Sequence, residues 1–203
     1  IYEKEETLNL EEGFGIQLAV NSISILNPIG FSKINKSDIY NPKNLDFYSK
    51  HDKVCNLDLT QFNTEKEKYS TLKRSSLISF LKGNLFSNVF RFSKTIKMIE
   101  HKEEKISLDF TDGNTDVVDF LIVADGVFSA TRSIVENKKT KINFQGAFAA
   151  RTTIRKNNFR IFDKENISII MCPNAHLVSY PVNENEYNFV ATIRNKPNTP
   201  DNK

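Results

Sequence analysis

The dipeptide Asp125-Gly126 combines two residue types that suit a ligand-binding turn. It directly follows residues 120–124, a continuously apolar run typical of a strand that is covered on both faces in a parallel sheet. We expect a short helix to begin near Ser129, whose side chain could cap it. Ligands of open α/β sheets bind at the carboxyl ends of strands, where glycine permits close approach and aspartate can accept hydrogen bonds from sugar hydroxyls. An ordinary Asp-Gly turn is the alternative interpretation.

Three further charged residues could bind a phosphate or a sugar. Arg132 lies three residues after Ser129 and could face a phosphate or an internal carboxylate, or form a surface ion pair. Glu3 follows what looks like the end of a strand, where an acid binds ribose hydroxyls in dinucleotide-binding folds; a solvated charge is the simpler interpretation. Arg74 directly precedes a predicted helix and could contact a phosphate or be solvated.

Other motifs carry weaker predictions. Gly13-Phe14-Gly15 precedes a helical pattern, which suits close backbone packing, an anion at the helix N-terminus or a plain loop. His176 and Tyr180 fall on a predicted strand, where a role in sheet packing is the default. The sequence contains no serine elbow and no recognisable nucleophile–base pair, so the catalytic residues stay unidentified. Cys55, Cys172 and the histidines lack metal-ligand spacing, and we predict no metal site and no disulfide framework.

Composition excludes several classes of protein. The 203 residues carry 28 Lys+Arg against 25 Asp+Glu, a formal charge of +3, which is too weak to indicate a nucleic-acid partner. Disorder requires low hydrophobicity with high net charge, and this chain has neither. No apolar run approaches the roughly 18–20 residues of a transmembrane helix. The first residues lack the basic and apolar regions of a signal peptide, and we expect a cytoplasmic protein without one.

Hydrophobic periodicity predicts helices over residues 16–29 and 75–85, the second capped by Ser75 or Ser76, and a further short helix over 32–39. Alternating and β-branched runs predict the strands, which fall at residues 45–49, 54–59, 89–92, 95–100, 105–110, 144–154, 167–171, 176–182 and 187–193. The order is mixed α and β first and mostly antiparallel β afterwards. This order favours an α/β domain with a β-rich partner.

These motifs occur in a familiar order. The chain resembles the FAD-dependent aromatic-ring monooxygenases of the salicylate hydroxylase and para-hydroxybenzoate hydroxylase type. Residues 124–132 match that family's A-D-G-x-x-S-x-x-R motif at every defined position, and residues 12–21 resemble its GxGIQLxxN segment. Residues 73–77 resemble its R-x-x-L helix entry, residues 176–182 its H-x-x-x-Y-P strand, and residues 149–151 its A-W-R segment. Ala150 replaces the aromatic residue in the last of these.

The resemblance implies a fold, a division into domains and a cofactor site. It implies an incomplete Rossmann-like FAD-binding domain of residues 1–44 and 70–140, and an antiparallel β-sheet substrate domain of residues 45–69 and 141–203. Glu3 would bind the adenosine ribose, and Arg74 would lie beside the flavin and pyrophosphate. Asp125, Gly126 and Arg132 would belong to the motif linked to FAD and NAD(P)H binding.

The resemblance also implies an activity. The enzyme would use NADH or NADPH and O₂ to hydroxylate an aromatic or quinone-precursor ring through a flavin C4a-hydroperoxide. A quinone-precursor substrate would allow peripheral contact with a membrane. The family's GxGxxG and later G-D motifs fall outside residues 1–203, so we expect a fragment that binds FAD poorly by itself. A non-hydroxylating flavin oxidoreductase and a non-catalytic remnant of the fold are the alternatives.

Overall fold

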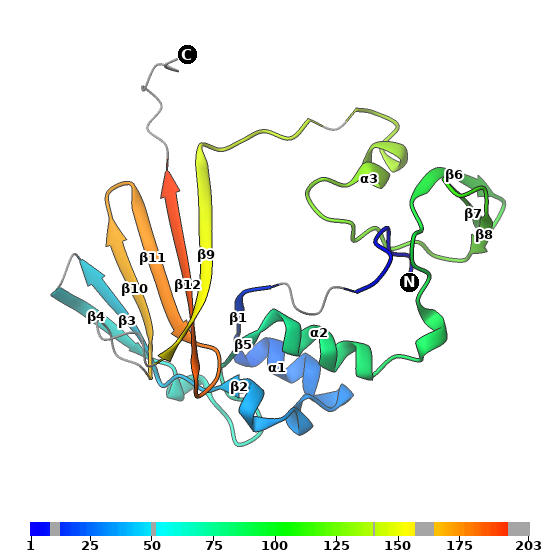
Figure 1. The fold of residues 1–203 in the computed structure, drawn as a ribbon. Helices are drawn as coiled ribbons and strands as arrows, with labels where there is room; N and C mark the ends of the chain where they lie inside the picture. The colour runs from blue at the N-terminus through cyan, green and yellow to red at the C-terminus, as the bar shows by residue number, and fades with distance from the viewer. Residues whose placement is uncertain (9–12, 50–51, 140, 157–164, 195–203) are drawn as a thin grey trace, which may run out of the picture. The chain divides into compact units, whose positions relative to one another are not determined.

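The chain folds into two compact units (Figure 1). The computed structural model describes residues 1–8, 13–49, 52–139, 141–156 and 165–194. The small unit comprises Ile1–Asn9 and Phe86–Gln145, and the large unit comprises Leu10–Leu85 and Gly146–Lys203. This division follows the contacts within each unit. The domains expected from the sequence were instead defined by the FAD or the substrate that each would bind, and they stay a prediction. None of the helices in the described part of the chain has the length and apolar character needed to cross a bilayer.

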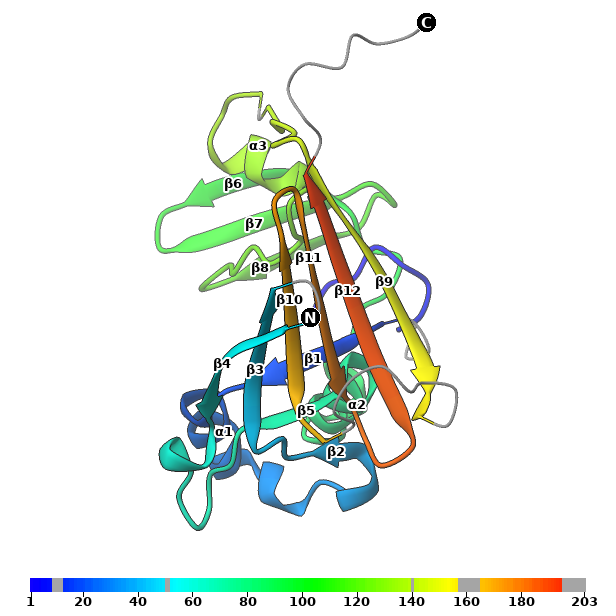
Figure 2. The same cartoon turned by 90° about the vertical axis from the view of Figure 1, so that its left-hand side faces the viewer.

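A six-stranded sheet is the largest element of the large unit (Figure 2). Its strand order is β4-β3-β10-β11-β12-β9, in which β3 and β10 run parallel and the other neighbours antiparallel. The structure confirms all six strands expected here, with shifts of a few residues at their ends. The strands are β3 Asn44–Ser49, β4 Asp52–Asp58, β9 Ala147–Arg155, β10 Ile167–Cys172, β11 Ala175–Pro181 and β12 Glu186–Arg194.

A second, three-stranded sheet of the large unit has the order β1-β5-β2, with β1 Gly15–Leu18, β5 Ser70–Lys73 and β2 Ile39–Tyr40. The helix predicted over residues 16–29 is therefore wrong at its start, because residues 15–18 pair with β5 as a strand. Helix α1 runs only from Val20 to Leu26 and continues as a 3-10 turn. The short helix predicted over residues 32–39 is likewise replaced by two 3-10 turns that lead into β2.

Helix α2, Arg74–Gly83, confirms the second predicted helix. The predicted caps are wrong, because the N-cap residue is Lys73 and it makes no side-chain capping bond. The free N–H of Arg74 instead donates to the carbonyl of Phe14 at 2.9 Å. The carbonyl of Phe14, from a distant segment, thus accepts a hydrogen bond from a backbone N–H at the helix start that has no partner within the helix.

Three polar contacts join the two sheets of the large unit. The N–H of Gly15 donates to Asn188 Oδ1 at 2.7 Å, and the buried hydroxyl of Thr71 donates to the carbonyl of Pro181 at 2.5 Å. Lys73 Nζ lies 2.6 Å from the carboxylate of Glu186. Burial alone would raise the pKa of Glu186, but hydrogen bonds from Lys73 and an asparagine amide outweigh it and hold that pKa below its usual value. Strands β1 and β5 are therefore fixed against β11 and β12.

The small unit contains the antiparallel sheet β6-β7-β8 and the helix α3. Its strands are β6 Ile96–Lys102, β7 Lys105–Phe110 and β8 Thr115–Val118, and α3 spans Ala130–Val135. The strand predicted at residues 89–92 is absent from the described structure, where Ser87–Val89 form a 3-10 turn and Arg91 makes a single bridge to Tyr2. The sequence did not predict β8, which follows the Gly113 turn.

The strand predicted at residues 120–124 is wrong for the described structure. These residues have no regular secondary structure and pair with no described strand. Phe120 is 88% exposed and Ile122 is 89% exposed, so an apolar segment typical of a sheet interior lies in solvent. A strand forms only where neighbours accept its backbone hydrogen bonds, and the described residues provide none.

The close packing of the two sheets at Gly15 predicts that a methyl group added there lowers the stability of the fold. A Cβ at Gly15 would lie 2.6 Å from Val182 Cγ1 and 2.7 Å from Asn188 Cβ, closer than carbon atoms can approach. We expect Gly15→Ala to lower the free energy of unfolding by about 1–3 kcal/mol, measured by urea denaturation. Gly83→Ala is the matched control, because its Cβ would meet nothing within 4 Å. Equal stability of the two variants would contradict this packing.

Candidate functional site

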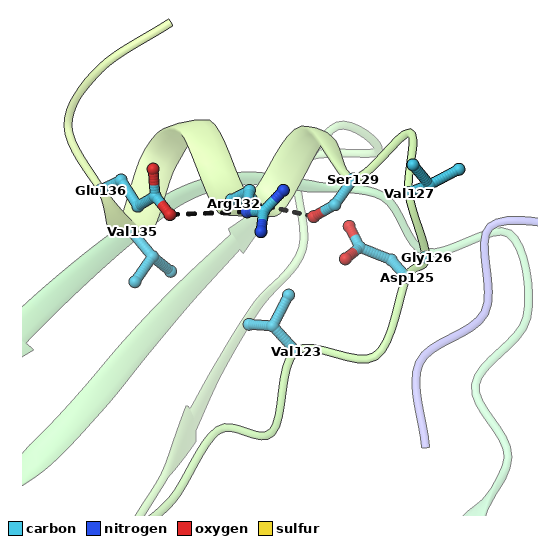
Figure 3. Close-up of a pocket in the computed structure, with 8 residues that line it drawn as sticks. All are labelled: Val123, Asp125, Gly126, Val127, Ser129, Arg132, Val135 and Glu136. Carbon is cyan, nitrogen blue, oxygen red and sulfur yellow. Dashed lines mark hydrogen bonds and ion pairs between the residues drawn. The ribbon is translucent and has the colours of Figure 1, made fainter. Parts of the chain in front are cut away.

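Residues from Val123 to Glu136 line an open surface cavity of about 430 Å³ in the small unit (Figure 3). The cavity lies between the turn at Asp125-Gly126 and helix α3. It is lined by Val123, Asp125, Gly126, Val127, Ser129, Arg132, Val135 and Glu136. Three of the five residues that the sequence singled out for cofactor binding, Asp125, Gly126 and Arg132, therefore line the same open cavity.

Hydrogen bonds to the start of helix α3 hold the Asp125 side chain in place. Its Oδ2 accepts from the N–H of Thr131 at 3.3 Å, and its carboxylate also accepts from the hydroxyls of Ser129 and Thr131. Burial alone would raise the pKa of Asp125, but these hydrogen bonds outweigh it and hold the pKa below its usual value. Asp125 is therefore ionised at neutral pH, and it can accept hydrogen bonds but not donate one.

Ser129 is the N-cap of α3, as the sequence predicts. Its Oγ accepts from the N–H of Arg132 at 2.9 Å (Figure 3), and its side chain also hydrogen-bonds to the Asp125 carboxylate. The same serine thus orders both the helix start and the carboxylate. Gly126 has φ +85°, and a Cβ there would meet nothing within 4 Å. The turn needs glycine for its backbone conformation, and the space beside it is open.

Arg132 is the third residue of α3 and forms an ion pair with Glu136, at 3.4 Å from Nε to Oε1 (Figure 3). Of the interpretations that the sequence allowed for Arg132, the surface ion pair is therefore present. The Arg132 side chain is 53% exposed, and an exposed pair between residues four apart contributes little to stability. The guanidinium is paired through Nε, and it remains part of the cavity wall.

The other two predicted residues lie outside this cavity lining. Glu3 belongs to the small unit, where its N–H donates to the carbonyl of Arg91 at 2.9 Å and its carboxylate accepts from the N–H of Glu5 at 3.1 Å. Arg74 belongs to the large unit, is exposed, and packs its stem against Gly13, whose φ is +137°. The structure therefore does not bring all five residues together within one unit.

The large unit contains a buried polar cluster that the sequence revealed only in part. Tyr180 is 3% exposed, and burial raises its pKa to about 12 even though Arg151, Gln17 and Asn188 act in the opposite direction. Tyr69 donates to Gln17 Oε1 at 2.8 Å. The sequence singled out Tyr180, and Gln17 falls within the GxGIQLxxN segment, but Asn188 carries no local signal. His176 is exposed on the same strand, in accord with its default role at a sheet face.

Similarity to known proteins extends over nearly the whole chain. The chain is 24% identical over 187 residues to 3-amino-4-hydroxybenzoate 2-monooxygenase PtmB3 of Streptomyces platensis. This match covers 90% of this chain and 46% of the relative. The structure of Klebsiella pneumoniae HpxO complexed with FAD and uric acid superposes with a TM-score of 0.79 at 16% identity, covering 98% of this chain and 51% of HpxO. A salicylate hydroxylase substrate complex gives a TM-score of 0.71 at 18% identity, covering 93% and 51%. No family model matches the chain.

The chain resembles the FAD-dependent aromatic-ring monooxygenases. This resemblance confirms the one that the motifs indicated, and the two solved structures share the fold. The chain spans about half the length of the curated relatives it matches. Its α/β fold with mixed and antiparallel sheets agrees with these monooxygenase neighbours.

The link between Ser129 and Asp125 predicts a shift in acidity. Ser129→Ala removes one donor to the carboxylate and the cap of α3, so the pKa of Asp125 should rise toward its ordinary value. Carboxyl NMR titration over the acidic range measures this shift, which moves the titration curve to higher pH. Ser87→Ala, at an exposed serine of the same unit, should leave the curve unchanged. A curve that Ser129→Ala does not move would contradict the hydrogen bond.

Proposed function

We propose that the full-length protein is an FAD-dependent monooxygenase that uses NADH or NADPH and O₂ to hydroxylate an aromatic or quinone-precursor ring. The observation that carries the proposal is the cavity that Asp125, Gly126 and Arg132 line together. The resemblance in sequence and fold to monooxygenases supports it, and one of the matched structures is described as holding FAD.

The cavity has a donor and acceptor set that fits part of a dinucleotide cofactor. An ionised carboxylate accepts hydrogen bonds from ribose or ribityl hydroxyls, and the guanidinium of Arg132 suits a phosphate. The open space at Gly126 allows a ligand to approach the backbone. We propose that Asp125, Gly126 and Arg132 hold FAD here, with Glu3 at the adenosine ribose and Arg74 beside the flavin and pyrophosphate. When bound, FAD supplies hydride acceptance and the activation of O₂.

The residues of the cavity act in binding and orientation. Asp125 keeps its negative charge at neutral pH because its pKa is lowered, so it orients hydroxyl groups and is unsuited to donating a proton. Ser129 and Thr131 fix the direction of its carboxylate. The rigid start of α3 thereby sets where a bound hydroxyl would lie, and displacement of the cofactor by small distances would be costly to the reaction.

The proposal includes the predicted domains. Residues 1–44 and 70–140 would form a Rossmann-like FAD-binding domain, and residues 45–69 and 141–203 would form the substrate side. The six-stranded sheet would face the substrate. PtmB3 is named for an aminohydroxybenzoate and another neighbour for salicylate, which favours a small aromatic substrate.

The proposal predicts a loss of FAD affinity when Asp125 loses its charge. In the full-length protein, Asp125→Asn keeps an acceptor for the N–H of Thr131 but weakens bonds from cofactor hydroxyls. We expect FAD affinity to fall roughly 10-fold to 100-fold, measured by titration of the apoprotein with FAD. Asp119→Asn is the matched control: it also removes one negative charge from the small unit, where Asp119 makes an exposed ion pair with Lys105.

The absorbance spectrum of the wild-type protein tests the function itself. Visible flavin bands that NADH or NADPH bleaches, together with a hydroxylated product from a phenol panel, would support the proposal. Bleaching without any hydroxylated product would favour the non-hydroxylating oxidoreductase. A colourless protein that rejects added FAD would favour the non-catalytic remnant.

A further inference from the structure

The large unit contains an open surface cavity of about 950 Å³ to which the proposed function assigns no role. Helix α1, the 3-10 turns after it, β2 and the loop of residues 65–68 contribute to its walls. In Figure 2, α1 and β2 lie at the lower end of the six-stranded sheet. Sites for small molecules typically enclose about 300–1,000 Å³, so the cavity is large enough for one. None of the residues proposed to bind FAD lines it.

The inner wall of this cavity is apolar. Ile23 and Phe31 belong to a core cluster of the large unit, and each is 3% exposed. Ile34, Ile39 and Tyr40 are half-buried on the same lining. Half-buried apolar side chains keep contact with water, so a flat apolar group that covered them would be favoured.

Three lysines from two separate segments also line the cavity. Lys36 lies in the 3-10 turn before β2, and Lys66 and Lys68 lie in the loop before β5. All three are exposed, and none forms an ion pair with another residue in the described part of the chain. Glu65 and Glu184 are on the lining too, so three cations against two anions leave a net charge of +1. Lysines bind phosphate as point charges, and several can contact one phosphate group.

The loop that carries two of these lysines is held by hydrogen bonds. Thr64 Oγ1 accepts from the backbone N–H of Lys66 at 3.3 Å and of Glu67 at 3.0 Å. Asn27 Nδ2 donates to the carbonyl of Lys66 at 2.9 Å. The backbone of the loop is thereby fixed against the 3-10 turn that follows α1.

The same asparagine has an unsatisfied acceptor. The bond to Lys66 fixes the direction of the Asn27 amide, and its Oδ1 is buried without a hydrogen-bond donor among the described residues. Asn27 is part of the cavity lining. A buried acceptor without a donor is unfavourable, and a hydroxyl or amino group of a ligand would supply one.

We propose that this cavity binds a nucleoside monophosphate, with the phosphate among Lys36, Lys66 and Lys68 and the base against the apolar wall. A phosphate monoester carries about two negative charges at neutral pH and so suits several lysines. The base is a flat group for the apolar wall, and the nucleoside has hydroxyl and amino donors for Asn27 Oδ1. A fatty acid lacks those donors, and inorganic phosphate leaves the apolar wall uncovered. This inference is independent of the proposed function.

The test compares AMP with its two parts. AMP, adenosine and inorganic phosphate are titrated separately into the full-length protein in the presence of saturating FAD, with binding measured by calorimetry. We expect AMP to bind at least about 10-fold more tightly than either part, because only AMP engages both the lysines and the apolar wall. AMP that binds no more tightly than adenosine and phosphate would overturn the proposal.

Two variants locate the binding within the cavity. Lys36→Gln and Lys68→Gln should each weaken AMP binding by roughly 3-fold to 10-fold and leave adenosine binding unchanged. Both lysines are exposed, so the variants should fold as the wild type does.

Lys82→Gln is the matched control. Lys82 is an exposed lysine of α2 in the same unit, outside the cavity lining, so AMP binding should persist in this variant. An AMP affinity that both cavity variants retain would place the nucleotide elsewhere, as at the cofactor site, and would overturn the proposal. An equal loss in Lys82→Gln would also overturn it, because the effect would then reflect overall charge.

Discussion

The close approach of Gly15 to Asn188 is the contact on which the large unit depends. The backbone N–H of Gly15 donates to Asn188 Oδ1 at 2.7 Å, and the absence of a Cβ makes this approach sterically possible. Asn188 is fully buried and lies opposite Tyr180 in the register of β11 and β12. The contact therefore holds β1 against β12 of the six-stranded sheet.

The two units carry different kinds of chemistry. The small unit presents an ionised carboxylate, an open glycine and an arginine around one cavity, all ordered by the start of a short helix. The large unit presents an extended sheet with a few buried polar side chains, Asn188 among them, and with Arg151 exposed on its edge strand β9. In the proposed enzyme the first set serves the cofactor and the second serves the substrate.

Local sequence patterns failed where pairing with a distant segment decided the structure. Residues 15–18 have helical periodicity, yet they form β1 because β5, more than fifty residues later, offers a complete antiparallel partner. Residues 120–124 have the composition of a buried strand, yet they form none, because no described strand lies beside them. Strand formation depends on hydrogen-bonding neighbours, and a linear pattern does not contain them.

The sequence by itself determined the six strands of the large sheet, helix α2, the Ser129 cap and the motif around Asp125, because each depends on side chains a few residues apart. It also indicated the resemblance to flavin monooxygenases, which the matched relatives confirm. Only the tertiary structure decided that residues 15–18 pair with β5 as a strand and that Gly15 must lack a side chain. These features arise from strand register and from contacts between segments up to 173 residues apart, as between Gly15 and Asn188. Register and long-range packing depend on the whole fold, because each shift of one residue turns a strand's side chains to the opposite face.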